Sequence, residues 1–105
     1  MEICNYVYEL TKKYPTEEKF GLTLQMRKAA ISIPSNIAEG AGKSSPKDFV
    51  RFLEISQASS YELDTQCIIS KNQEYLSESE FEKLSNDLSE FQKMIFSLIK
   101  SKSNY

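Results

Sequence analysis

The sequence predicts an all-α protein: an up-down-up-down antiparallel four-helix bundle that forms a single domain over residues 1–105. Three observations support this fold class. Apolar residues recur every three or four positions over most of the chain, as they do on one face of a helix. Short segments containing serine, proline or glycine join the patterned stretches, and short connections place successive helices antiparallel. Only three glycines and three prolines occur in 105 residues, too few for the many turns of an all-β fold.

The first helix is expected over residues 2–13. Its apolar stripe is Ile3, Val7, Leu10 and Tyr14. Pro15 ends it, because the residue before a proline avoids helical geometry. This helix is short for one that must pair with longer partners.

The second helix is expected from Thr16, as its N-cap, to about Gly40. Glu17 and Glu18 fall in its first turn, where negative charge complements the helix dipole. Its inner face is expected to consist of Leu22, Met26, Ala29, Ile33 and Ile37.

The end of this second helix, residues 25–42, is dense in small side chains. Pro34 lacks an N–H group and clashes with the carbonyl of Ala30, so we expect a kink there. Gly40 and Gly42 are expected to end the helix in left-handed or flexible backbone. A helix of this kind is suited to the close approach of a neighbour.

The third helix is expected from Pro46 to about Asn72, because Ser45 is a good N-cap and proline is favoured at the first helical position. Its stripe has serine in the middle: Phe49, Leu53, Ser56, Ser60, Leu63 and Cys67. Small side chains at these positions would let two helix axes come closer than leucine would.

The fourth helix is expected from Glu78 to about Lys102, after a capping box formed by Ser77 and Glu80. Its heptad is the most regular in the chain: Phe81, Leu84, Leu88, Phe91, Ile95 and Leu98. Several apolar residues of helices three and four fall outside the main stripes, namely Phe52, Ile55, Met94, Phe96 and Ile99. A second apolar edge predicts self-association; the alternative is that the helices bury a wide face within one chain.

Several polar residues are expected to be structural. Antiparallel pairing about a loop near Lys43 sets Arg27 opposite Ser59 and within reach of Glu62, so a charge pair could fix the helix register. Asn36 and Ser32 flank Pro34 and could satisfy backbone groups that the proline leaves free. Structural roles are thus expected for Arg27, Pro34, Asn36, Glu39, Gly40 and Glu62.

The chain lacks the residues of the common catalytic and metal sites. It has no histidine, which excludes Ser-His and Cys-His pairs and the Glu-x-x-His ligands of di-metal bundles. Cys4 and Cys67 lack zinc-site spacing, so we interpret both as reduced thiols. No glycine-rich phosphate loop is present. We therefore predict no catalytic residue, no metal site, no cofactor and no enzymatic activity.

Charge is unevenly distributed although the net charge is only −2. Residues 19–51 contain six basic and two acidic side chains, whereas residues 52–92 contain nine acidic and two basic ones. The basic part centres on the loop between helices two and three. Spacing alone favours ordinary surface lysines over phosphate binding there. No secretory leader or membrane-spanning run is recognisable, so the expected location is the cytoplasm.

Residues 25–40, QMRKAAISIPSNIAEG, resemble the signature of a four-helix-bundle family. That family is named after the protein encoded in intervening sequences of bacterial 23S ribosomal RNA genes, and it is also labelled S23 ribosomal protein. The matching positions are Gln25, Arg27, Ala29, Ser32, Ile33, Pro34, Asn36, Ile37, Ala38, Glu39 and Gly40, with Met26 and Lys28 as mild substitutions. A second block matches at Arg51, Phe52, Leu53, Ile55, Ser59, Glu62, Leu63, Thr65 and Gln66.

This resemblance carries expectations about assembly and partners. Family members usually begin with a longer first helix, and this chain starts inside it. The family is similar to the accessory protein of diversity-generating retroelements, a homopentamer that binds a reverse transcriptase and nucleic acid. The resemblance therefore implies a homo-oligomer, most often a pentamer, without enzymatic activity and with RNA or DNA as a partner. The expected contact residues are Arg27, Lys28, Lys43, Lys47 and Arg51. The alternative is an oligomeric adaptor that docks a protein partner and binds no nucleic acid.

Overall fold

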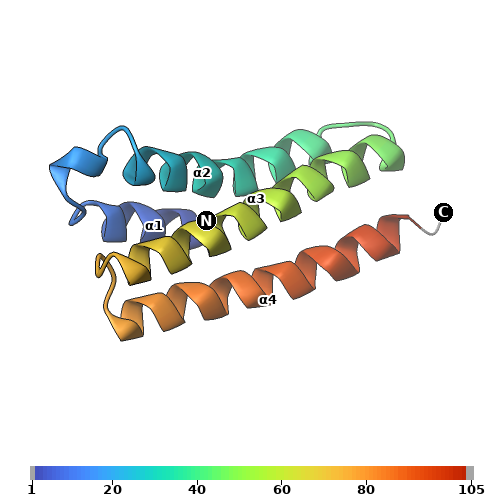
Figure 1. Cartoon of the computed structure of the whole chain (residues 1–105). Coiled ribbons are helices and arrows are strands. Elements are labelled where there is room, and N and C mark those ends of the chain that lie inside the picture. The colour runs from blue at the N-terminus through green and yellow to red at the C-terminus, as the bar shows by residue number, and fades with distance from the viewer. Residues whose placement is uncertain (1, 104–105) are drawn as a thin grey trace.

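The computed structural model describes residues 2–103, and these form an elongated all-α bundle of 46 × 23 × 18 Å. Its elements are α1 (Glu2–Thr11), a 3₁₀ turn η1 (Thr16–Glu18), α2 (Leu22–Ala41), α3 (Pro46–Asn72) and α4 (Glu78–Lys102). Successive helices run antiparallel, and α1 packs against both α2 and α4 while α3 packs against α2 and α4 (Figure 1). The predicted four-helix bundle is confirmed.

The core lies along the axis that the four helices share. Leucine dominates it, together with small and β-branched residues from α1 and α2. Its fully or nearly fully buried apolar side chains are Val7, Leu10, Met26, Ala29, Ala30, Ile33, Leu53, Leu63, Cys67, Leu84, Leu88 and Ile95. The apolar stripes read from the sequence therefore identify the core of all four helices.

The start of α2 differs from the expectation. Thr16 begins a separate 3₁₀ turn, and the α-helix starts six residues later at Leu22. The side chain of Glu18 supplies the cap: its Oε1 accepts a hydrogen bond from the backbone N–H of Leu22 at 3.1 Å. Its other oxygen accepts from the hydroxyl of Tyr75 at 3.0 Å. Glu18 therefore takes the capping role assigned to Thr16 and ties this turn to the connection between α3 and α4.

Pro34 lies inside α2, which is continuous from Leu22 to Ala41. Two side chains serve backbone carbonyls beside it. The amide of Asn36 donates to the Ser32 carbonyl at 2.8 Å, and the hydroxyl of Ser56 donates to the Ile33 carbonyl at 2.8 Å. Neither acceptor is the carbonyl of Ala30, which the missing N–H of Pro34 leaves free, so these bonds do not confirm the role expected of Asn36 and Ser32.

Gly40 does not end α2 by adopting a left-handed backbone conformation. Within the described residues no glycine has a positive φ, and the C-cap Gly42 has a φ of −82°. Gly40 instead is a buried residue of α2, at the place where α3 crosses it. A Cβ at position 40 would lie 2.8 Å from the Cβ of Phe52 and 2.9 Å from Cδ1 of Phe49. The glycine is therefore required by close packing and not by backbone conformation.

The buried serines of α3 confirm the expected close approach of α2 and α3. Ser56, Ser60 and Ser70 have no exposed surface. Each hydroxyl has a carbonyl acceptor: that of Ile33 for Ser56, and those of Gln57 and Gln66 for the other two, at 2.6 and 2.9 Å. Because every hydroxyl is satisfied, small polar side chains replace leucine here without leaving an unpaired donor.

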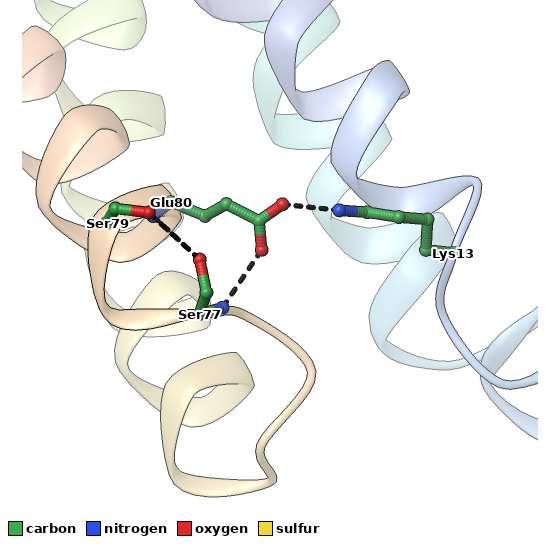
Figure 2. A network of polar contacts seen from close by, with 4 residues as sticks. All are labelled: Lys13, Ser77, Ser79 and Glu80. Carbon is green, nitrogen blue, oxygen red and sulfur yellow. Dashed lines mark hydrogen bonds and ion pairs between the residues drawn. The ribbon is translucent and has the colours of Figure 1, made fainter.

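The N-terminus of α4 holds the expected capping box (Figure 2). Ser77 Oγ accepts from the N–H of Glu80 at 3.1 Å, and a Glu80 carboxylate oxygen accepts from the N–H of Ser77 at 2.9 Å. The second Glu80 oxygen forms an ion pair with the ammonium of Lys13, just beyond the end of α1. The Lys13 hydrogen bond, followed by that from the Ser77 backbone, lowers the pKa of Glu80 below its ordinary value. One carboxylate therefore caps α4 and ties it to α1.

Candidate nucleic-acid interface

Two basic side chains converge on one aromatic ring at the turn between α2 and α3. The ammonium of Lys43 lies 5.4 Å from the centre of the Phe52 ring, and the guanidinium carbon of Arg51 lies 5.1 Å from it. Lys47, one turn before Arg51 on α3, is exposed. We call Lys43, Lys47 and Arg51, together with Phe52, the turn cluster. Cations held over a ring face gain from its negative quadrupole and lose some side-chain freedom.

Nearby carboxylates reduce the net positive charge of the turn cluster. Glu39 lies 3.6 Å from the Lys43 ammonium, one helical turn before it, so its expected structural role takes the form of an exposed ion pair. Asp48 occupies the first turn of α3. Three basic groups against these two acids leave a local charge of +1. The cluster is therefore a modest electrostatic feature, which only repetition in an assembly would make strong.

Arg27 and Lys28 do not belong to this cluster. At 1.5 Å per residue, Arg27 lies about 24 Å from Lys43 along the axis of α2. Its Nε donates to the hydroxyl of Thr11 at 2.8 Å, and its guanidinium carbon lies 4.6 Å from the centre of the Tyr8 ring. The structure thus brings three of the five expected contact residues together. It directs Arg27 toward α1.

The expected Arg27–Glu62 pair is wrong. Glu62 is exposed, and neither residue takes part in an ion pair within residues 2–103. The reason is the direction of the Arg27 side chain, which contacts Thr11 and Tyr8 of α1. Ser59, the residue predicted to lie opposite Arg27, instead shares a hydrogen bond of 2.7 Å with Ser32. The two helices are thus displaced by five residues from the simple pairing about the loop. Arg27 fixes α1 against α2 rather than α2 against α3.

Sequence reasoning treated Phe52 as part of a self-association edge and missed its place under two cations. A signal was available, because Arg51 directly precedes it and Lys43 lies across a short loop. The same applies to Tyr8, whose ring receives Arg27. In both cases the aromatic partner comes from a neighbouring element or from an adjacent position, which helical periodicity alone does not reveal.

The described residues offer little for catalysis or metal binding. Over residues 2–103, no three carboxylates or thiols gather as a metal site would require. Cys4 and Cys67 are free thiols, as expected. Burial raises the pKa of the Cys67 thiol to about 11, so this group is protonated and unreactive at neutral pH. Within the same residues, every helix is too short or too polar for a membrane-crossing segment.

The family model described as 23S rRNA-intervening sequence protein matches residues 1–97. The chain belongs to this family. The match to the 23S rRNA-intervening sequence protein family includes the turn cluster and most of α4. No curated protein matches the chain.

A solved relative supports the assignment to the 23S rRNA-intervening sequence protein family. It is a protein of unknown function from the S23 ribosomal protein family of Bacteroides thetaiotaomicron VPI-5482, with a crystal structure at 1.70 Å resolution. The two structures superpose with a TM-score of 0.87 at 28% sequence identity, over 94% of this chain and 89% of the relative. The relative therefore supports the fold and the family assignment. Because its own function is unknown, it indicates no activity.

Proposed function

We propose that this protein is a non-catalytic, cytoplasmic homo-oligomer that contacts RNA or DNA through the turn cluster. The observation that carries the proposal is the convergence of Lys43 and Arg51 on Phe52, with Lys47 exposed beside them. Backbone phosphates are bound by such cations, and a half-buried aromatic ring holds their stems in place.

Repetition would compensate for the low charge of one cluster. A homo-oligomer presents the same three cations once per subunit, and linked weak contacts gain avidity without any new interaction. We propose a pentamer as the assembly. Exposed apolar side chains support self-association: Phe20, Ile55, Tyr61, Ile68, Met94 and Phe96 each expose more than two fifths of their surface. Light scattering at micromolar concentration tests the assembly, and a monomer would contradict it.

The contact is tested by fluorescence anisotropy with a labelled RNA hairpin and a DNA duplex of matching sequence. If three phosphates are neutralised per contact, affinity should fall roughly 40-fold between about 50 and about 200 mM salt. The variant Lys43→Glu/Lys47→Glu/Arg51→Glu should lose binding at both salt concentrations.

The matched control is Lys12→Glu/Lys100→Glu/Lys102→Glu, which changes net charge equally at exposed positions outside the turn cluster. It should retain most of the affinity. Equal losses in the two triple variants would mean that net charge, and not the turn cluster, governs binding.

A second candidate function is an oligomeric adaptor that docks a protein partner. The observation that favours it is the outer face of α3, where Tyr61, Ile68 and Ile69 are exposed among the acidic side chains of residues 52–92. Such a surface repels nucleic acid and suits a protein. If neither RNA nor DNA binds at low salt, the nucleic-acid proposal fails and the adaptor is favoured.

A further inference from the structure

The outer surface between α3 and α4 carries exposed aromatic side chains. The two helices lie side by side (Figure 1), and the amide of Gln92 on α4 donates a hydrogen bond of 2.6 Å to the carboxylate of Asp64 on α3. Gln92 also lines a shallow hollow of about 380 Å³, which has Tyr61 on the α3 side and Phe96 on the α4 side. These two side chains expose 52% and 61% of their surface, so the hollow has aromatic walls that are open to solvent.

Helical spacing extends this apolar surface along α3. Ile68 follows Tyr61 by seven residues, which places it on the same side of α3, and about half of it is exposed. At 1.5 Å per residue, the two positions lie about 10 Å apart along the helix axis. Anchors one and two turns apart are the spacing with which an amphipathic helix binds in a groove. We call the surface formed by Tyr61, Ile68 and Phe96, with the hollow between the two rings, the α3–α4 groove.

Acidic side chains surround the α3–α4 groove. Four charged residues of α4 face elsewhere, because Glu80 is bound to Lys13 and a separate pocket beside α1 is lined by Lys83, Asp87 and Glu90. Over residues 61–74 and 78–96, the other charged side chains are five acids and two bases, namely Glu62, Asp64, Glu74, Glu78 and Glu82 against Lys71 and Lys93. The groove therefore has an excess of three negative charges.

This charge excess indicates which kind of molecule the groove fits. A nucleic acid would be repelled by the same carboxylates. A second copy of this chain would offer the exposed stripe of Leu24, Lys28 and Ile31 on α2, which brings one positive charge against three negative ones. A helix of another protein, with several lysine or arginine residues beside its apolar face, would complement both the apolar centre and the acidic surroundings.

We propose that the α3–α4 groove binds a basic amphipathic helix of a protein partner, with one apolar anchor between Tyr61 and Phe96 and a second against Ile68. Lysine or arginine residues beside these anchors contact Glu62, which is exposed next to Tyr61, and Glu82, which is exposed two turns before Ser89 of the hollow. The inference rests on the adaptor function proposed as the second candidate and names the chemistry of its partner. It leaves the turn cluster free for nucleic acid.

Three designed peptides test the chemistry of the occupant. The probe is a fluorescein-labelled peptide of about 18 residues, or about five helical turns, with leucine and lysine at helical spacing. A second peptide has glutamate in place of every lysine, and a third has the composition of the probe in an order that forms no apolar face. Fluorescence anisotropy with the whole chain should show saturable binding of the probe and at least about tenfold weaker binding of the other two. Equal binding of either comparison peptide would contradict a basic amphipathic helix as the ligand.

Removal of the two aromatic walls locates the bound peptide. Both rings are more than half exposed, so Tyr61→Ala/Phe96→Ala should fold, which its circular dichroism melting curve checks. This variant should bind the leucine–lysine probe at least about tenfold more weakly. Met94→Ala removes a similarly exposed apolar side chain of α4 that borders the pocket beside α1, and it should bind the probe as the wild type does.

Charge reversal tests the acidic surroundings of the groove. Glu62→Lys/Glu82→Lys should weaken binding of the leucine–lysine probe and strengthen binding of its glutamate counterpart. Glu2→Lys/Glu90→Lys changes the net charge equally at two exposed positions beside α1 and should leave both affinities unchanged. Equal effects of the two double variants would mean that net charge, and not the groove, attracts the peptide.

The possible outcomes separate this inference from the proposed functions. Undiminished probe binding by Tyr61→Ala/Phe96→Ala would overturn the groove as the site while the adaptor function stands. A wild type that binds none of the peptides would overturn the basic helix as the partner. If the same double variant turned an oligomer into a monomer in light scattering, a second copy would occupy the groove and the inference would fail. The nucleic-acid proposal is judged separately, by the anisotropy of the labelled RNA hairpin and DNA duplex.

Discussion

The Cα of Gly40 faces α3 so closely that any added Cβ would lie 2.8 Å from the Cβ of Phe52. The nearest atoms also include the Phe49 carbonyl oxygen, at 3.3 Å, so backbone as well as side chain stands in the way. The contact packs the end of α2 against Phe52, whose ring lies beneath the cationic groups of Lys43 and Arg51. The geometry of the turn cluster therefore depends on the absence of a side chain at position 40.

Gly40→Ala is accordingly expected to destabilise the bundle. Alanine is a better helix former than glycine by about 1 kcal/mol, but overpacking costs roughly 1–3 kcal/mol, so a net loss of about 1 kcal/mol should remain. The measurement is urea denaturation followed by circular dichroism. Gly42→Ala is the matched control, because its added Cβ would meet nothing nearer than 3.5 Å and its φ is already negative. Equal midpoints for the two variants would contradict the close contact.

Arg27→Ala should also destabilise the protein, through α1 rather than α3. The substitution removes the hydrogen bond to Thr11 and the stacking on Tyr8. A loss of about 1–2 kcal/mol is expected. Lys28→Ala, the next and exposed position, should change unfolding by less than about 0.5 kcal/mol. A double-mutant cycle with Thr11→Val should show coupling, whereas a cycle with Glu62→Gln should show none.

Ser77→Ala should weaken the start of α4. It deletes the acceptor of the Glu80 N–H while leaving the reciprocal bond from the Ser77 N–H in place. N-cap serine to alanine changes cost about 1 kcal/mol. Ser79→Ala removes only a hydroxyl contact of 3.2 Å with Ser77 and serves as the control in thermal unfolding. If both variants melt together, the capping box contributes nothing measurable.

The lowered pKa of Glu80 gives stability a defined dependence on pH. The Lys13 ammonium and the Ser77 N–H both favour the charged carboxylate, so the folded state binds this proton less readily than the unfolded state. The contribution is therefore complete above the ordinary value of 4.5 and is lost as the pH falls through the lower folded-state pKa. Denaturation midpoints measured from neutral pH to about pH 3 should show this loss.

Glu80→Gln isolates the contribution of that carboxylate. The variant should be less stable than the wild type at neutral pH, and the difference should shrink toward zero in acid. Glu82→Gln, at an exposed position on the same helix, is the control. A difference between wild type and Glu80→Gln that stays constant with pH would contradict the assigned role.

The sequence was most informative where the pattern is periodic. The bounds of α3 and α4, the α4 capping box and most core residues were predictable, because leucine and serine at helical spacing and Ser-x-x-Glu have local physical meaning. The small-residue stretch 25–42 was recognised as suited to close approach, whereas Gly40 itself was assigned to the helix end. That error is instructive, since a glycine near a helix terminus can serve either backbone conformation or packing.

Features set by tertiary contact were not predictable. Glu18 and not Thr16 caps α2, because a 3₁₀ turn precedes the helix and the long Glu18 side chain reaches forward to the N–H of Leu22. The partner of Arg27 could not be read from residue numbers, since its side chain contacts Thr11 and Tyr8 of α1 and not α3. The register of α3 against α2 depends on how Gly40 and the buried serines pack. Local sequence patterns predict where the helices begin and end. The register between two helices depends on how their side chains pack, which local patterns do not show.

Helix α2 also has two parts with different protection. Near Met26 the helix is enclosed by α1 and α3, whereas Ala38, Glu39 and Ala41 in its last turns are exposed. Amide protons in the enclosed part should exchange with solvent only when the whole bundle unfolds. Those near Ala41 should exchange through local opening that leaves the core intact. Hydrogen exchange would then record two opening free energies along one continuous helix.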